Sequence, residues 1–65
     1  MEWKNTNNGE LPANGQKVLV SVRGVNYIAE YDQSKKLFRV TDEPIETFFR
    51  ISEHDIAWVH DVKIA

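Results

Sequence analysis

The chain has 65 residues, a formal net charge of −2 and no cysteine. This length leaves room for one domain, residues 1–65, with a small core and correspondingly modest stability. The missing thiols exclude a disulfide framework and any cysteine metal site. Mild acidity disfavours binding to duplex nucleic acid, because domains with that function usually carry net positive charge.

The first ten residues are polar. Trp3 opens the segment, and an Asn-Asn-Gly run within Lys4–Glu10 is typical of loops, so we expect a loop there. The segment lacks the apolar stretch of a secretory signal, and the chain has no run approaching the roughly 20 apolar residues of a membrane helix. We therefore expect a cytoplasmic location.

The run from Leu11 to Arg23 gives the clearest local signal. Pro12 and the Asn14-Gly15 pair predict a turn. In Lys17–Arg23, every second residue is a valine, which predicts a strand with one buried face. The valines of that face are Val18, Val20 and Val22.

Two further strands are expected before residue 41. Gly24 interrupts the pattern, and Val25–Tyr31 resumes it, so the short connection predicts a tight antiparallel hairpin. The polar run Asp32–Lys36 predicts a second turn, which leads into Leu37–Val40. The three strands would form a meander.

Residues 41–55 fit two alternatives. Acidic residues and Pro44 could open a helix that places Ile45, Phe48 and Phe49 at helical spacing and buries both rings. Glu46–Ile51 also suits a strand because it contains Thr, Phe and Ile, and in that case Phe48 faces solvent opposite Phe49. We favour a strand over Phe48–Ile51.

The last expected elements are a short helical turn and a strand. In Ser52–Asp55, Ser52 is placed to cap a single turn. Ile56–His60 then predicts the final strand.

Together these elements predict an all-β, or β-rich α+β, fold of four or five antiparallel strands. A flat sheet of this size would leave one face wet, so we expect the meander to curl into a partly open SH3-like barrel. The expected core residues are Val18, Val20, Val22, Tyr27, Ala29, Phe38, Val40, Phe49, Ile51, Ile56 and Trp58.

The pattern of turn and core residues resembles a small family common in phages and prophages, domain of unknown function 551. The matching residues are Trp3, Leu11, Pro12, Gly15, Val18, Leu19, Val20, Tyr27, Ala29, Tyr31 and Trp58. The resemblance covers most of the chain and implies an accessory protein of mobile elements. It brings no catalytic residue to this sequence.

The densest group of reactive side chains is Glu53-His54-Asp55, followed by His60. Imidazoles and carboxylates are suitable ligands for a divalent metal. Adjacent residues point in different directions, however, so we expect a solvated turn with neither metal nor cofactor. The serines lie in no nucleophile-elbow context and the glycines are scattered, so we expect no enzyme.

Aromatic side chains are numerous for so short a chain, and we do not expect all of them to fit inside. Exposed aromatic residues favour contacts with other proteins. We therefore hypothesise a non-enzymatic interaction module that binds a protein partner or forms a homodimer. The interaction candidates are Trp3, Tyr27, Tyr31, Phe48 and Trp58.

The alternative is a domain that binds single-stranded nucleic acid by stacking bases on aromatic rings next to basic residues. Residues 1–41 carry six basic and four acidic side chains, whereas residues 42–61 carry six acids and one arginine. The acidic part would repel a phosphate chain. The residues of this hypothesis are Tyr27, Tyr31, Trp58, Lys35, Lys36 and Arg39.

Overall fold

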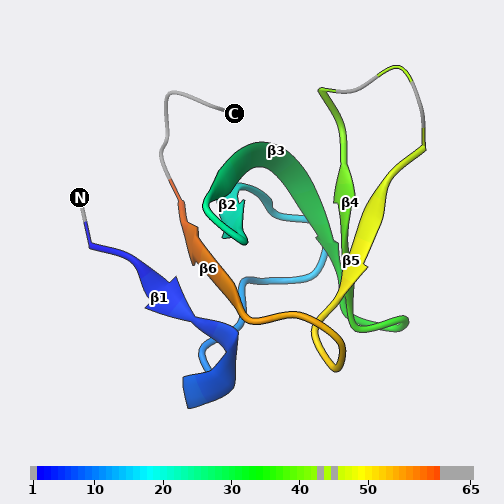
Figure 1. Ribbon diagram of the computed structural model, residues 1–65. Coiled ribbons are helices and arrows are strands. Elements are labelled where there is room, and N and C mark those ends of the chain that lie inside the picture. Colours follow the sequence, from blue (N-terminus) through cyan, green and yellow to red (C-terminus); the bar gives the residue numbers. More distant parts are fainter. Residues whose placement is uncertain (1, 43, 45, 61–65) are drawn as a thin grey trace.

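The computed structural model describes residues 2–42, 44 and 46–60. In this part of the chain there are six strands and one 3-10 turn, η1 (Figure 1). No helix among the described residues is long and apolar enough to cross a membrane. The elements are β1 (Lys4–Asn5), η1 (Thr6–Asn8), β2 (Lys17–Val22), β3 (Val25–Asp32), β4 (Leu37–Val40), β5 (Phe48–Arg50) and β6 (Ile56–Val59).

The strands form one antiparallel sheet in the order β1-β6-β2-β3-β4-β5. The predicted meander is confirmed, because β2, β3, β4 and β5 pair in succession. The chain then returns so that β6 lies beside β2, and β1 pairs with β6. Figure 1 shows β3 arching strongly, which curls the sheet. The sheet does not close into a barrel, and β1 and β5 are its two edges.

The β2–β3 hairpin has a two-residue loop, Arg23-Gly24. Val22 pairs with Val25, and the φ angles of Arg23 and Gly24 are 54° and 80°. Two positive φ angles define the type I′ turn, whose twist matches that of the flanking strands. The tight hairpin expected from Gly24 is thereby confirmed.

The turn at Pro12–Gly15 fastens the start of β2 to the end of β3. The Gly15 N–H donates to the Tyr31 carbonyl at 2.7 Å, and the Tyr31 N–H donates to the Gln16 carbonyl at 3.1 Å. Gly15 has a φ of 79°, a value that glycine adopts without a steric penalty. The turn therefore extends the β2–β3 ladder beyond the strand itself.

The core cluster contains Val18, Val20 and Val22, so the buried face predicted from the alternating valines is confirmed. Tyr27, Phe49 and Ile51, which were expected inside, are half-buried and pack against the core from its rim. Tyr31, Leu37 and Val59 are buried although the pattern of the sequence did not predict it. The buried hydrophobic residues are Val18, Val20, Val22, Ala29, Tyr31, Leu37, Phe38, Val40, Ile56, Trp58 and Val59.

The prediction of a loop over Lys4–Glu10 is wrong at its start. β1 and η1 lie there, and Lys4 pairs with Trp58 of β6. The cause is tertiary: the Thr6 hydroxyl donates to the Ile56 carbonyl at 3.2 Å, which draws the segment onto the edge of β6. A strand of two residues carries no periodicity that a sequence pattern could reveal.

The short helical turn expected over Ser52–Asp55 is also wrong. The connection between β5 and β6 is a hydrogen-bonded turn in which the Glu53 N–H donates to the Arg50 carbonyl at 3.1 Å. It therefore begins before Ser52, which is not its cap. Within the described ranges the helical turn is η1, and the Asn5 side chain caps it by accepting from the Asn7 N–H at 2.8 Å.

The strand alternative for residues 48–51 is confirmed over Phe48–Arg50. Ile45, which the helix alternative needed, lies outside the described residues. The last strand is confirmed as β6 and ends at Val59, one residue before the expected end at His60.

Candidate interaction surface

The five interaction candidates lie in different environments. Trp3 and Phe48 are each 41% exposed, and Tyr27 is half-buried. Tyr31 and Trp58 are buried, with 2% and 4% of their surface exposed. Only the first two therefore offer a large aromatic surface to a partner in the described part of the chain.

Trp58 anchors the amino-terminal segment to the core. Its indole Nε1–H donates to the Glu10 carbonyl at 2.9 Å, and Lys4 Nζ lies 5.3 Å from the ring centroid. Buried indoles usually pair their N–H in this way. The ring serves the fold in this conformation and offers no open face for stacking.

Tyr31 packs against Phe38, with 5.0 Å between the ring centroids. Burial raises the pKa of its hydroxyl above the ordinary value of 10.0, and the negative charge of Asp32 raises it further. Tyr27 contacts Phe49 in a similar tilted arrangement at 5.1 Å. Both tyrosines are therefore engaged with neighbouring rings.

Trp3 and Phe48 do not form one patch. Trp3 immediately precedes β1, and Phe48 begins β5, so the two rings lie at opposite edges of the sheet. Four strands separate β1 from β5 in the sheet order. A surface that includes Phe48 must be built from β5 and its neighbours.

The backbone of β5 directs hydrogen-bonding groups outward at the sheet edge, and of these the Arg50 carbonyl already accepts from the Glu53 N–H. The Val40 N–H donates to the Thr47 carbonyl at 2.8 Å, and the Ile51 N–H donates to the Lys36 carbonyl at 3.1 Å. In an antiparallel pair, bonded positions alternate. Phe48 and Arg50 are therefore the positions whose backbone groups point away from β4.

The other edge is covered by its own chain. The Asn5 N–H of β1 donates to Glu10 Oε1 at 3.2 Å. β1 is also only two residues long, and η1 follows it at once. Short strands and covering loops are the usual means by which proteins protect a sheet edge. The edge formed by β5 has no such cover among the described residues.

Arg50 belongs to the same surface as Phe48, and sequence analysis did not single it out. The guanidinium carbon lies 5.0 Å from the centroid of the Phe48 ring. Arg50 Nη1 also lies 3.7 Å from Glu53 Oε1, but both side chains are more than half exposed, so this pair adds little stability. The sequence did contain a signal for placing Arg50 beside Phe48, because residues two apart in a strand share a face.

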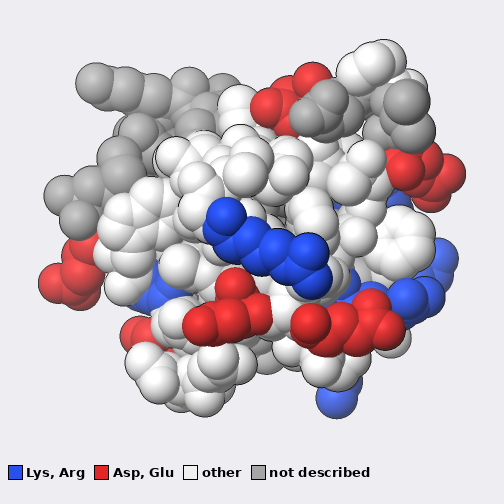
Figure 2. Space-filling view, in the orientation of Figure 1, with Lys and Arg blue, Asp and Glu red and all other residues white. Residues whose placement is uncertain are grey.

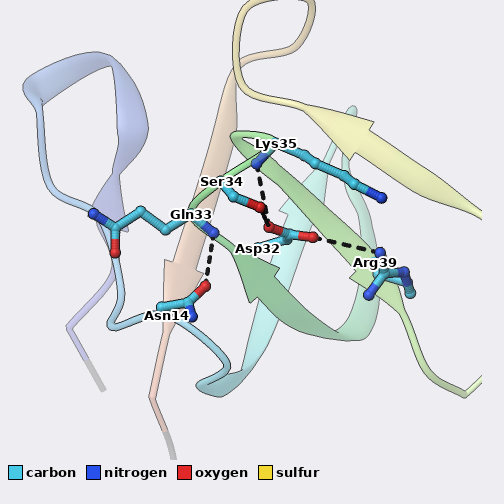
Figure 3. A network of polar contacts seen from close by, with 6 residues as sticks. All are labelled: Asn14, Asp32, Gln33, Ser34, Lys35 and Arg39. Atoms are coloured by element: carbon cyan, nitrogen blue, oxygen red, sulfur yellow. Dashed lines mark hydrogen bonds and ion pairs between the residues drawn. The ribbon is translucent and has the colours of Figure 1, made fainter.

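Asp32 organises the turn between β3 and β4 (Figure 3). Its Oδ1 accepts from the Ser34 hydroxyl at 2.7 Å and from the Lys35 N–H at 3.2 Å, and Arg39 Nη2 lies 3.5 Å from Oδ2. The Ser34 hydrogen bond is the main cause that lowers the pKa of Asp32 below its ordinary value of 3.8. The Arg39 guanidinium thus has an acidic partner, and Lys35 contacts the same carboxylate through its backbone N–H.

Charges of both signs are mixed over the surface. Lys17 lies opposite Glu30, and Glu30 lies opposite Arg39, so the signs alternate across β2, β3 and β4. Figure 2 likewise shows acidic and basic side chains next to one another on the face in view. The uneven charge along the sequence therefore does not become a basic face beside the tyrosines. Glu43 and Asp61 of the acidic set lie outside the described residues.

An open depression of about 490 Å³ lies where the β2–β3 turn meets the β5–β6 connection. His54 lines it and packs its ring edge-on against Phe49 at 5.3 Å. Among the described residues, no group of three or more His, Asp or Glu side chains could hold a metal. The other lining residues are Asn5, Ser21, Arg23, Gly24, Glu53, Asp55 and Ala57.

Comparison with known proteins places the chain in no family. No protein-family model, curated protein or solved structure matches it. The resemblance to the phage-associated family thus stays a hypothesis based on the residues that carry it.

Proposed function

We propose that this protein is a small, non-enzymatic interaction module that binds a protein partner through the edge of β5. The observation that carries the proposal is the exposed ring of Phe48 on a strand whose outward backbone groups have no strand partner in the described structure. An accessory role in phages or prophages and a likeness of the curled, open sheet to a partly open SH3-like barrel belong to the same proposal.

A sheet edge binds proteins by a well-understood route. An extended segment adds a strand to the edge, and its backbone supplies affinity while side chains supply selectivity. Phe and Arg are both enriched in the buried centre of protein interfaces relative to the rest of the surface. The mixed surface charges also favour a protein partner over a phosphate chain.

The nucleic-acid hypothesis receives less support. Of its three proposed stacking rings, Tyr31 and Trp58 are buried and Tyr27 contacts Phe49. The Arg39 guanidinium lies beside a carboxylate of Asp32.

Site-specific photocrosslinking tests this proposal. Phe48 is replaced by benzoylphenylalanine and the protein is irradiated in the cells that naturally contain it. We expect a covalent protein adduct. The same analogue at Val25, which is 51% exposed and lies on β3, separated from β5 by β4 in the sheet order, serves as the control and should give none. The absence of any adduct at position 48, or equal adducts at both positions, would contradict the proposal.

A further inference from the structure

We infer that the partner at β5 is a second copy of this chain, bound by antiparallel pairing of the two β5 edges about a two-fold axis at Phe48. This inference rests on the proposed function and names its partner. The two sheets would join into one continuous sheet across the axis.

The backbone geometry restricts the possible registers. In antiparallel pairing, a bonded pair consists of two residues that both direct their N–H and carbonyl groups toward the other strand. On β5 those residues are Phe48 and Arg50, and the next position of the same parity is Glu46. Residues of this parity must therefore pair with one another across the axis.

Charge selects one of these registers. Glu46 and Arg50 stand two positions before and two positions after Phe48. When Phe48 of one copy lies opposite Phe48 of the other, Glu46 of each copy lies opposite Arg50 of its mate. A shift by one bonded pair in either direction removes both of these opposite-charge contacts. Directly opposed charges of unlike sign stabilise strand pairs, and like charges weaken them.

The side chains at the axis fit this arrangement. Phe48 is 41% exposed, so pairing would bury a ring that now faces solvent. The guanidinium of Arg50 already lies over the Phe48 ring of its own chain and is placed to reach the carboxylate of the mate. Its contact with Glu53 is long and exposed, and therefore easily exchanged.

The interface is short, which sets its strength. Pro44 lacks an N–H, and the Arg50 carbonyl already accepts from the Glu53 N–H, so pairing extends from Glu46 to Arg50. Such a contact buries less surface than the roughly 1,600 Å² of a standard stable interface. We therefore expect a weak, reversible dimer that becomes evident at high protein concentration.

Charge reversal tests the register. The association constant is measured by analytical ultracentrifugation for the full chain and for Glu46→Arg, Arg50→Glu and the double variant. Symmetry makes each single reversal act twice, so we expect each to weaken association by about tenfold or more. The double variant restores both opposite-charge contacts and should associate about as well as the original chain.

Val25→Asp is the matched control, because Val25 is also an exposed hydrophobic residue but lies on β3, which β4 separates from β5 in the sheet order. It should leave association unchanged. A chain that stays monomeric at millimolar concentration would overturn the inference. So would a dimer that ignores the single reversals, that the double variant fails to restore, or that Val25→Asp disrupts equally.

The two proposals fail in different ways. A monomeric chain that nevertheless gives a Phe48 adduct with another protein in cells would refute the dimer and leave the interaction function standing. A dimer that the single charge reversals weaken and the double variant restores supports both proposals. A monomeric chain without any adduct at position 48 refutes both.

A cysteine variant gives a second measurement of the axis. The chain contains no cysteine, so Phe48→Cys introduces a single thiol. Opposed residues of a bonded antiparallel pair lie about 5.5 Å apart at Cα, within disulfide range. Under mild oxidation we expect disulfide dimers to form faster from Phe48→Cys than from Val25→Cys. Equal rates of disulfide formation in the two variants would contradict a two-fold axis at Phe48.

Discussion

At the scale of single residues, the structure assigns clear physical roles to side chains that the sequence marks only as polar. Asp32 is the best example, because three groups approach its carboxylate and lower its pKa. Arg23 is another, since it adopts a left-handed conformation in a loop where Asn, Asp or Gly is usual. Each role leads to a test.

Replacing Asp32 should change how stability depends on pH. The folded pKa of Asp32 is lowered, so its contribution to stability is present above the unfolded value near 3.8 and disappears as pH falls through the folded value. We expect Asp32→Asn to lose stability at neutral pH and to show a flatter decline in acid, as measured by urea unfolding across this range. Ser34→Ala removes the hydrogen bond that contributes most to the lowered pKa of Asp32, so it should give part of this effect. An unchanged acid dependence in Asp32→Asn would contradict this role.

Replacing Arg23 should stabilise the hairpin. A left-handed conformation costs an ordinary L-residue roughly 1–2 kcal/mol, and Asn tolerates it better. We expect Arg23→Asn to raise the free energy of unfolding by about 0.5–1 kcal/mol, measured by urea denaturation. Gly24→Ala, with a φ of 80° at that position, should lower it by about 1 kcal/mol. A destabilised Arg23→Asn would show that the arginine side chain makes a compensating contact.

At the scale of elements, strands with a suitable local sequence could be predicted, whereas elements that depend on tertiary contacts could not. The alternating valines predicted β2. The Thr, Phe and Ile content of Glu46–Ile51 predicted β5, and a strand there predicted that the Phe48 ring is exposed opposite Phe49. β1 was not predictable, because it pairs with Trp58 and Ala57 of β6, at the other end of the chain. Their spacing in the sequence placed Tyr27 and Tyr31 on one face of the strand but did not show how deeply each ring is buried. The buried Tyr31 could therefore not be distinguished from the half-buried Tyr27.

For the interaction surface, the sequence supplied Phe48 but not its setting. Whether β5 lies at an edge depends on which strands flank it, and this follows from the return of β6 to β2. The burial of Trp58 depends equally on its hydrogen bond to the Glu10 carbonyl, a backbone group that any residue could provide. These relations arise only when the chain is folded.

Trp58→Phe should loosen the amino-terminal segment. The change removes the indole hydrogen bond to Glu10 and leaves a cavity beside Lys4, for a combined cost of about 2–3 kcal/mol. Urea unfolding measures the loss. Amide exchange should accelerate most in β1 and η1, whereas a uniform acceleration across the sheet would contradict the anchoring role.

At the scale of the whole molecule, the two edges of the open sheet differ. One is short and covered by Glu10, and the other carries Phe48 with outward backbone groups. Exposed edges invite pairing with another chain, so natural proteins usually protect them. A small domain also gains stability by association, since its own core is limited. Both considerations favour β5 as the place where this molecule meets a second one.

Amide hydrogen exchange at β5, followed by NMR over a range of protein concentrations, tests this most directly. Ile51 serves as an internal reference, because its N–H already donates to Lys36 within one chain. We predict that the Phe48 and Arg50 amides exchange quickly in dilute protein and become protected as concentration rises, while Ile51 stays protected throughout. Fast exchange at Phe48 and Arg50 at every concentration would contradict pairing at this edge.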